Sequence, residues 1–254
     1  MVNVQIMKIS VITAVYNRKE SVSRALLSIK NQSYKNVEIV VVDGGSSDGT
    51  QEAVKSVLDE NDYFISEPDD GIYDALNKGI TAATGEIICF LHSDDIYHCN
   101  DALSSVAQVF ESDVDVVYGD VSFFTRDKID SVVRVYRSDK LNVKNLTWGK
   151  MPAHPAIFIR RKIYDAIGMF KTHYMIAADY EFLCRMVTSM NCTSVYLPRL
   201  IVRMQMGGVS TAGFRNSLQL NKEVLRACRE NGLKTNILML LSKYPSKLLQ
   251  LLRK

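Results

Sequence analysis

Cysteine is scarce in this sequence and is not spaced for metal binding. Five cysteines occur among 254 residues, and no two of them form a Cys-x-x-Cys pair. An odd number without paired spacing argues against both a disulfide framework and a tetrahedral zinc site. We therefore expect a reduced, cytoplasmic setting for the protein.

A secretory leader and long apolar runs are also missing. The N-terminal stretch MVNVQIMKISVITAVYN has neither a basic start nor a small-residue cleavage site, and Asn17 and Arg18 end its apolar run early. We expect no transmembrane segment. The glycine spacing of a dinucleotide-binding loop or a P-loop is likewise absent, which argues against those nucleotide sites.

What is present is the composition of a globular α/β protein with uneven charge. The chain is 47% hydrophobic and 23% charged, enough for one large domain or two small ones. Residues 211–254 hold nine basic and two acidic side chains, whereas the remainder holds 22 basic and 26 acidic. An acidic body suits cation binding, and a basic tail suits a surface rich in phosphate.

Apolar, β-branched runs alternate with helical periodicity along the first ninety residues. We predict strands at residues 8–15, 37–42, 63–66 and 86–91, with helices through residues 22–29, 53–58 and 72–82. This alternation is typical of a mostly parallel sheet with helices on both faces.

The second half of the sequence predicts further strands and a helical end. We expect a strand at 114–118, a hairpin over 121–136, a strand at 156–159, and helices at 161–167 and 178–189. No linker is evident before Thr211. We therefore predict one catalytic domain, residues 1–210, followed by a basic helical C-terminal extension, residues 211–254.

Polar residues follow each of the first four predicted strands. They are Tyr16 to Arg18, Asp43, Glu67 to Asp70, and Ser93 to Asp95. In a parallel sheet the carboxyl ends of the strands meet at one edge, where ligands bind. These loops should therefore converge on one crevice.

Two adjacent acids, Asp94 and Asp95, follow the apolar run that ends at Leu91. Neighbouring carboxylates repel each other unless a positive charge lies close by, and oxygen ligands of this kind suit Mg²⁺ or Mn²⁺. The alternative is that the pair caps the next helix. Asp43 also has two interpretations: a hydrogen-bond acceptor for a nucleobase or ribose, or the first residue of an Asx turn.

Four ordered motifs carry a resemblance to a known family. They are ISVITAVYNRKESVSRALLSIKNQSY, IVVVDGGSSDGT, EPDDGIYDALNKGITAATGEIICFLHSDD and AADYEFLCRM. From about Lys8 to Ser210 the sequence resembles the family 2 glycosyltransferases of the GT-A fold, particularly bacterial enzymes of O-antigen or capsule-type polysaccharide synthesis. The resemblance implies a Rossmann-like, mostly parallel sheet flanked by helices.

The resemblance also implies an activity. The enzyme would transfer one hexose, with inversion, from a nucleotide-diphosphate sugar, with UDP favoured, to a lipid-linked or oligosaccharide acceptor, using Mn²⁺ or Mg²⁺. The Gln-x-x-Arg-Trp signature of processive relatives is absent, so one sugar per encounter is expected. The alternatives are a sugar-nucleotide nucleotidyltransferase and a non-catalytic carbohydrate- or nucleotide-binding module.

Site residues follow from the same resemblance, position by position. It places Ala14, Tyr16 and Arg18 near the base and ribose, Asp94 at the ribose, Asp95 on the metal, and Asp179 as general base. Asp43 and Asp70 join the donor site. For Asp179 the alternative is the N-cap of the helix that follows.

Two positions depart from the family pattern. Gly44 stands where many relatives carry a second Asp, so a base contact from that side chain is not expected. His92 stands where many carry Asp or Asn, so a cluster of three carboxylates is absent.

Three further residues are secondary candidates. His154 could contact the diphosphate or the acceptor, or be structural, since its ordinary pKa commits it to no role. Arg203 and Ser210 flank a Gly-Gly loop that resembles a family loop near donor or acceptor, although turn chemistry explains the glycines equally well.

The C-terminal segment, residues 236–254, mixes short apolar clusters with four basic residues and is interrupted by Pro245. One interpretation is a peripheral anchor on the anionic cytoplasmic face of the inner membrane. The other is a helix packed on the domain or on a second subunit. We do not expect nucleic-acid binding, because interleaved aromatics and a reading motif are missing.

Overall fold

The apolar run at the N-terminus forms a central strand, β1 (Ile9–Val15), of a nine-stranded sheet. The computed structural model describes residues 6–138, 140–207 and 213–242. The remaining strands are β2 (Val37–Asp43), β3 (Tyr63–Ser66), β4 (Ile87–Phe90), β5 (Ile96–Tyr97), β6 (Val116–Phe124), β7 (Arg134–Tyr136), β8 (Ile157–Arg160) and β9 (Ser194–Gln205). The helices are α1 (Lys19–Lys30), α2 (Thr50–Lys55), α3 (Ile72–Ala82), α4 (Ala102–Phe110), α5 (Val143–Thr147), a 3-10 turn (His154–Ala156), α6 (Arg161–Ile167), α7 (Ala178–Ser189), α8 (Gly213–Glu230) and α9 (Ile237–Leu241).

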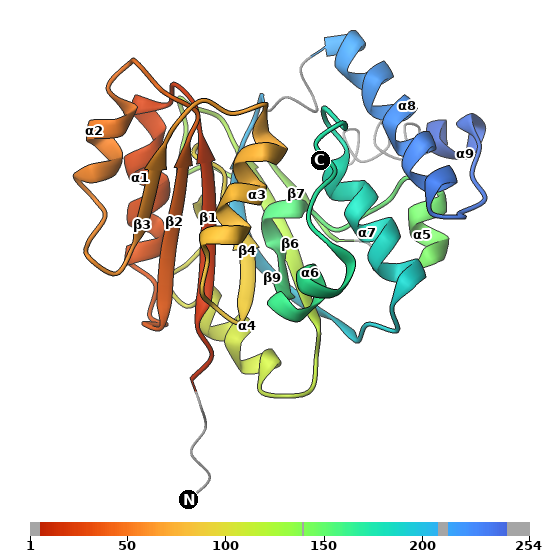
Figure 1. Cartoon of the computed structure of the whole chain (residues 1–254), viewed down its shortest axis with the longest axis horizontal. Helices are drawn as coiled ribbons and strands as arrows, with labels where there is room; N and C mark the ends of the chain where they lie inside the picture. Colours follow the sequence, from red (N-terminus) through yellow and green to blue (C-terminus); the bar gives the residue numbers. More distant parts are fainter. Residues whose placement is uncertain (1–5, 139, 208–212, 243–254) are drawn as a thin grey trace, which may run out of the picture.

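The sheet is parallel at one side and mixed at the other (Figure 1). Its order is β3-β2-β1-β4-β8-β6-β9-β5, with β7 paired to β6. The first four strands are parallel, as predicted, whereas β8 runs antiparallel to both β4 and β6. The loops after β1, β2, β3 and β4 therefore emerge at one edge.

Two apolar layers bury the sheet, because β1 is apolar on both faces. Ile9 and Val11 pack with α1, α2 and α4 on one side, and Ile12 packs with α3, α6, α7 and α8 on the other. Each fully buried aliphatic side chain contributes roughly 1.5–3 kcal/mol by removal from water. The α/β class predicted from the sequence is confirmed.

Several predicted boundaries are confirmed, and several short or irregular elements were missed. The strand at 63–66 and the helices at 72–82, 161–167 and 178–189 form as predicted. The strand at 114–118 and the first arm of the hairpin form one strand, β6, and β7 is the second arm. The elements that were not predicted are helices α4 and α5, strands β5 and β9, and the 3-10 turn at His154–Ala156.

Strand β9 escaped prediction because its sequence, SVYLPRLIVRMQ, contains proline and arginine and lacks regular alternation. It pairs in parallel with β6 through a register irregularity near Gly119. A Cβ at Gly119 would lie 2.5 Å from Cγ1 of Ile201. Glycine is therefore needed for β9 to approach β6.

Helix α8 shares a core with the preceding domain. Its residues Val224, Ala227 and Cys228 are buried in the same apolar cluster as Phe182 and Leu183 of α7. Residues 243–254, most of the predicted membrane segment, lie outside the described residues. Within the described ranges, no helix has the length and apolar character needed to span a bilayer.

Candidate active site

The loops after the parallel strands are hydrogen-bonded to one another at the sheet edge. The Gly44 N–H donates to the Val15 carbonyl at 2.9 Å, and the Glu67 N–H donates to the Asp43 carbonyl at 3.0 Å. The Asn17 N–H donates to Ser46 Oγ at 2.8 Å. The predicted convergence of the first three loops is therefore present.

Asp43 lies inside this edge and is fully buried. Its carboxylate accepts hydrogen bonds from the Ser46 N–H at 2.9 Å, from the Ser46 hydroxyl, and from the Ser66 hydroxyl at 2.6 Å. The Ser46 N–H lies three positions after Asp43, one more than in the Asx turn of the alternative interpretation, so the carboxylate closes a wider local turn. Because Ser46 in turn binds Asn17, Asp43 acts here by holding the first loop in place.

The first loop presents two exposed side chains. Tyr16 is 61% exposed, and Arg18 is also exposed, whereas Ala14 is half-buried on β1. Asn17 between them has φ 50°, a left-handed conformation that asparagine tolerates. Its side chain accepts the Ser47 N–H at 3.1 Å, which fixes the loop.

The loop after β3 contains Asp69 and Asp70. Asp70 is exposed, and its N–H donates to the Asp74 carboxylate at 3.2 Å. A Cβ at Gly44 would lie 2.4 Å from Oδ2 of Asp69. A side chain at position 44 would therefore require the Asp69 carboxylate to turn away.

Asp94 and Asp95 follow β4, but their environments differ. Asp95 is only 2% exposed; its Oδ1 accepts the Gln205 N–H of β9 at 2.9 Å, and its buried Oδ2 has no hydrogen-bond partner. Burial, and then the neighbouring Asp94, raise the pKa of Asp95 well above its ordinary value. Asp94 remains partly exposed. A strand, β5, and not a helix follows the pair, so the capping interpretation is wrong.

The two carboxylates fit a divalent cation that takes its other ligands from substrate and water. Among the described residues, no group of three or more His, Cys, Asp or Glu side chains forms a metal cluster. An all-protein cage is therefore not present in that part of the chain. The unpartnered Oδ2 of Asp95 beside Asp94 is, however, an arrangement that a cation would stabilise.

Asp179 lies in the first turn of α7. The N-cap of this helix is Ala177, so the capping interpretation of Asp179 is wrong. Its Oδ1 accepts the Tyr180 N–H at 2.8 Å and lies 3.2 Å from the Tyr73 hydroxyl. Burial raises the pKa of Asp179, although these hydrogen bonds and nearby His92 partly oppose the shift.

Aromatic side chains surround Asp179 and exclude water from one side of it. A cavity of about 10 Å³ beside the carboxylate is lined by Phe90, His154, Phe170 and Phe182, among others. That volume holds one water molecule at most. The apolar wall explains why the protonated form of Asp179 is favoured.

Two histidines lie beside these acids. The rings of His92 and His154 are 6.0 Å apart, and His154 lies 4.9 Å from the ring of Phe90. Burial, and then His154, lower the pKa of His92 to about 4, against the opposing charges of Asp94 and Asp179. Burial also lowers the pKa of His154 to about 4. Both imidazoles are therefore neutral near pH 7, and His92 lies within electrostatic range of both aspartates.

The remaining candidates lie elsewhere or beyond the described residues. Arg203 packs its guanidinium 5.6 Å from the ring centre of Phe124 and donates to the Ile129 carbonyl, so it is engaged by the protein itself. Ser210 lies outside the described residues.

Sequence reasoning missed Tyr73 and Gln205, and it treated His92 only as a departure from a pattern. Nothing local to Tyr73 or Gln205 signals a contact with Asp179 or Asp95, because the partners are 106 and 110 positions away.

A parallel sheet with carboxylates at its carboxyl edge, continued by antiparallel strands, is the α/β architecture of the GT-A fold. S. aureus TarS 1-349 in complex with UDP-GlcNAc superposes with a TM-score of 0.70 at 18% identity, over 87% of this chain and 66% of that one. The mannosyltransferase PcManGT from Pyrobaculum calidifontis, in complex with GDP-Man and Mn²⁺, gives 0.63 at 21% identity, over 88% and 65%. This chain thus spans slightly less than two thirds of each.

The sequence comparisons define the family. Residues 10–168 match the model of glycosyl transferase family 2. A PGL/p-HBAD biosynthesis glycosyltransferase of Mycobacterium bovis is 30% identical over 207 residues, covering 79% of this chain and 78% of the relative. An uncharacterized glycosyltransferase of Mycobacterium tuberculosis is 29% identical, covering 80% and 77%. The chain belongs to the family 2 glycosyltransferases.

Proposed function

We propose that this protein transfers one hexose, with inversion, from a UDP-sugar to a lipid-linked or oligosaccharide acceptor of surface-glycan synthesis. The observation that carries the proposal is the link between the two sides of the crevice: His154 lines the cavity beside Asp179, and its ring lies 6.0 Å from the ring of His92, two positions before Asp94. A carboxylate at the donor edge of the sheet and a carboxylate of raised pKa on α7 thus lie around one crevice. This is the arrangement that direct displacement at an anomeric carbon requires.

The chemistry assigned to the chain is a proton transfer. The acceptor hydroxyl gives its proton to the Asp179 carboxylate while its oxygen bonds to the anomeric carbon. The bond from that carbon to the diphosphate oxygen breaks, and the nucleoside diphosphate leaves. A carboxylate with a raised pKa suits the role, because a general base works best when its pKa approaches the working pH.

The cation is assigned to Asp94 first and Asp95 second. From sequence we expected Asp95 to be the ligand; the burial of Asp95, its bond to Gln205 and the partial exposure of Asp94 support Asp94 instead as the more accessible carboxylate. A bound Mn²⁺ or Mg²⁺ would supply positive charge to stabilise the leaving diphosphate. Asp95 would contribute its unpartnered oxygen or orient its neighbour.

The proposed donor and acceptor classes are supported by the names of related proteins. One structural neighbour is a UDP-GlcNAc complex, and the mycobacterial relatives are named for PGL/p-HBAD biosynthesis. These names support a UDP-sugar and a lipid-linked acceptor for this chain. Tyr16, exposed beside the β2 loop, would stack on the base.

A donor panel tests the proposal. The purified protein is incubated with UDP-, GDP- and dTDP-sugars plus Mn²⁺, and the released product is identified. We expect nucleoside diphosphate from a UDP-sugar. Pyrophosphate formed from a nucleoside triphosphate and a sugar phosphate would indicate a nucleotidyltransferase, and no turnover with measurable donor binding would indicate a non-catalytic module.

We further propose that the C-terminal end brings the enzyme to an anionic membrane surface on the cytoplasmic face, where a lipid-linked acceptor lies. Helix α9 leaves Ile237, Leu238 and Leu241 exposed, Leu238 by 75%, which supports an apolar contact with lipid. Deletion of residues 236–254 should abolish cosedimentation with vesicles containing phosphatidylglycerol. Full binding by a folded deletion variant would refute the anchor.

A further inference from the structure

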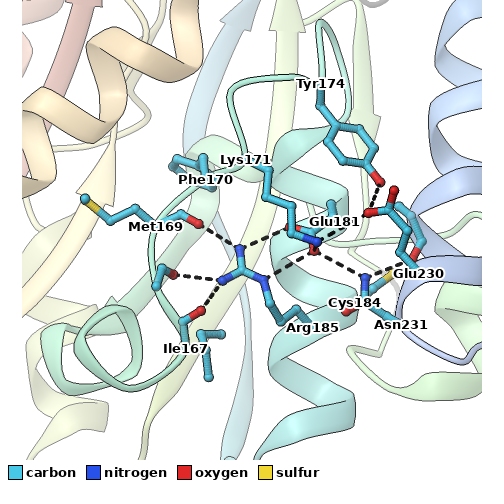
Figure 2. Close-up of polar contacts among 12 residues, drawn as sticks. Ile167, Met169, Phe170, Lys171, Tyr174, Glu181, Cys184, Arg185, Glu230 and Asn231 are labelled. Atoms are coloured by element: carbon cyan, nitrogen blue, oxygen red, sulfur yellow. Dashed lines mark hydrogen bonds and ion pairs between the residues drawn. The ribbon is translucent and has the colours of Figure 1, made fainter.

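The segment that joins α6 to α7, residues 168–177, leads directly into Asp179. Figure 2 shows how its first part is held. The Arg185 guanidinium donates to the carbonyls of Ile167, of Gly168 at 3.1 Å, and of Met169 at 2.7 Å. Glu181, which is 0% exposed, fixes Arg185 by an ion pair of 3.1 Å. This half of the segment is therefore tied to α7 itself.

The middle of the segment is tied to α8 as well (Figure 2). Lys171 pairs with Glu181 at 2.9 Å and with Glu230 at 3.3 Å. The Tyr174 hydroxyl donates to Glu230 at 2.9 Å, and the Asn231 amide donates to Glu181 at 3.3 Å. Lys171 thus joins a carboxylate of α7 to a carboxylate of α8.

The last part of the segment is held by a single side chain of α8, Glu223. Its Oε1 accepts the Met175 N–H at 3.0 Å, and its Oε2 accepts the Ile176 and Ala177 N–H groups, both at 2.9 Å. These three donors precede α7 and have no helical carbonyl to bind. A carboxylate here also suits the positive end of the α7 dipole.

The surroundings of Glu223 keep its carboxylate both buried and ionised. It is 5% exposed, and burial by itself would raise its pKa. The hydrogen bond from Gln219, at 2.8 Å, and the three backbone donors outweigh burial and lower the pKa of Glu223. The side chain is therefore ionised over the range in which an enzyme of this kind works.

The contact continues from Glu223 to the proposed base. The Tyr73 hydroxyl lies 2.6 Å from the Ile176 carbonyl and 3.2 Å from Asp179 Oδ1. The peptide units that Glu223 holds are thus the ones that also set the position of Tyr73 relative to Asp179. A shift of the Ile176 carbonyl would change how the single Tyr73 hydroxyl proton is divided between that carbonyl and Asp179.

We infer that Glu223 is a positioning residue for the transfer reaction, holding the backbone before α7 so that Asp179 faces the acceptor hydroxyl. The inference rests on the proposed role of Asp179 as general base. It also makes α8, which lies beyond the residues matched by the family model, part of the catalytic apparatus.

The first test is Glu223→Gln in the full chain, with the UDP-sugar identified by the donor panel. The amide keeps the volume of the side chain but places N–H groups against backbone donors. We expect kcat to fall about 10- to 100-fold, since a displacement of about 1 Å has that effect. The donor KM should stay within about twofold, because Glu223 is remote from the donor edge. Lys222→Gln, an exposed neighbour on α8, is the matched control and should keep the wild-type kcat.

A double-mutant cycle separates positioning from general damage. In an Asp179→Asn background, adding Glu223→Gln should lower kcat by less than about threefold, because the group it positions is already gone. Equal losses in both backgrounds, or an unchanged kcat in the single variant, would overturn the inference. If circular dichroism shows that Glu223→Gln does not fold, Glu223→Asp, which keeps the charge but is one methylene shorter, replaces it.

The outcomes also distinguish the inference from the function on which it rests. A large loss in Asp179→Asn with no loss in Glu223→Gln leaves the proposed base intact and removes only the positioning role. An unchanged kcat in Asp179→Asn overturns both.

Discussion

The Tyr73 hydroxyl lies 3.2 Å from the Asp179 carboxylate, which joins α3 to α7 across 106 positions of the chain. Burial, and then the charge of Asp179, raise the pKa of Tyr73 well above its ordinary value, so the phenol remains a neutral donor. A hydrogen bond to the ionised carboxylate favours that form. Tyr73 therefore moderates the upward shift that burial imposes on Asp179.

Tyr73→Phe should move the acidic limb of the kcat profile to higher pH. The base must be ionised, so activity is lost as pH falls through the pKa of Asp179, which already lies above its ordinary 3.8. Removing the phenol removes a contact that lowers this pKa. At mildly acidic pH we expect a loss of about 2- to 10-fold, the usual worth of one hydrogen bond. A uniform loss at every pH would contradict this role.

Asp179→Asn should lower kcat by about 100- to 10,000-fold, the contribution of a positioned general base. The amide retains the size of the side chain and can still accept the Tyr180 N–H. Binding of the UDP-sugar, measured by calorimetry, should be nearly unchanged. Equal losses of donor affinity and turnover would count against the proton-transfer role.

Asp94→Asn and Asp95→Asn should differ in their response to metal. We expect Asp95→Asn to raise the Mn²⁺ concentration needed for half-maximal activity by about 10- to 100-fold, as for a group that orients a ligand. Asp94→Asn should raise it further, since Asp94 is the more exposed carboxylate. If Asp95→Asn raises the required Mn²⁺ concentration more than Asp94→Asn does, then Asp95 is the direct ligand of the cation. Chelation and refilling with Mn²⁺ or Mg²⁺ should abolish and restore wild-type activity.

A buried acid far from the crevice should govern acid stability. Glu38 pairs with Lys8 at 2.6 Å and accepts the Thr84 hydroxyl at 2.7 Å. Burial alone would raise its pKa, but the contacts from Lys8, Ser10 and Thr84 lower it from 4.5 to about 2. Because the folded pKa is depressed, the stabilisation is complete above pH 4.5 and is lost as pH falls toward 2.

Glu38→Gln should therefore flatten the decline in stability between pH 4.5 and 2. At pH 7 it should lower the free energy of unfolding by about 1–3 kcal/mol, because buried partners lose a charged acceptor. Denaturant titrations at several pH values measure both effects. Glu52→Gln, an exposed acid on α2, is the control and should leave the profile unchanged.

Local pattern determined much of this protein. The periodicity of residues 8–91 is a property of neighbouring positions, so the strands, the helices between them and the convergence of the loops at one edge followed from sequence alone. Four motifs in a fixed order also indicated the glycosyltransferase family, because each motif is a short stretch of neighbouring residues. Their spacing therefore needed no knowledge of distant contacts.

Tertiary structure decided what distant backbone does to particular side chains. Asp94 and Asp95 are the same residue type at adjacent positions, so the sequence does not distinguish them. In the folded chain the Gln205 N–H of β9 donates to Asp95, which is buried. In the sequence, Glu223 has no feature that sets it apart from other helix residues. In the folded chain, three N–H groups of the segment before α7 donate to its carboxylate. Such contacts leave no local signature, because the free energy that fixes them comes from burial and hydrogen bonding between parts of the chain that meet only on folding.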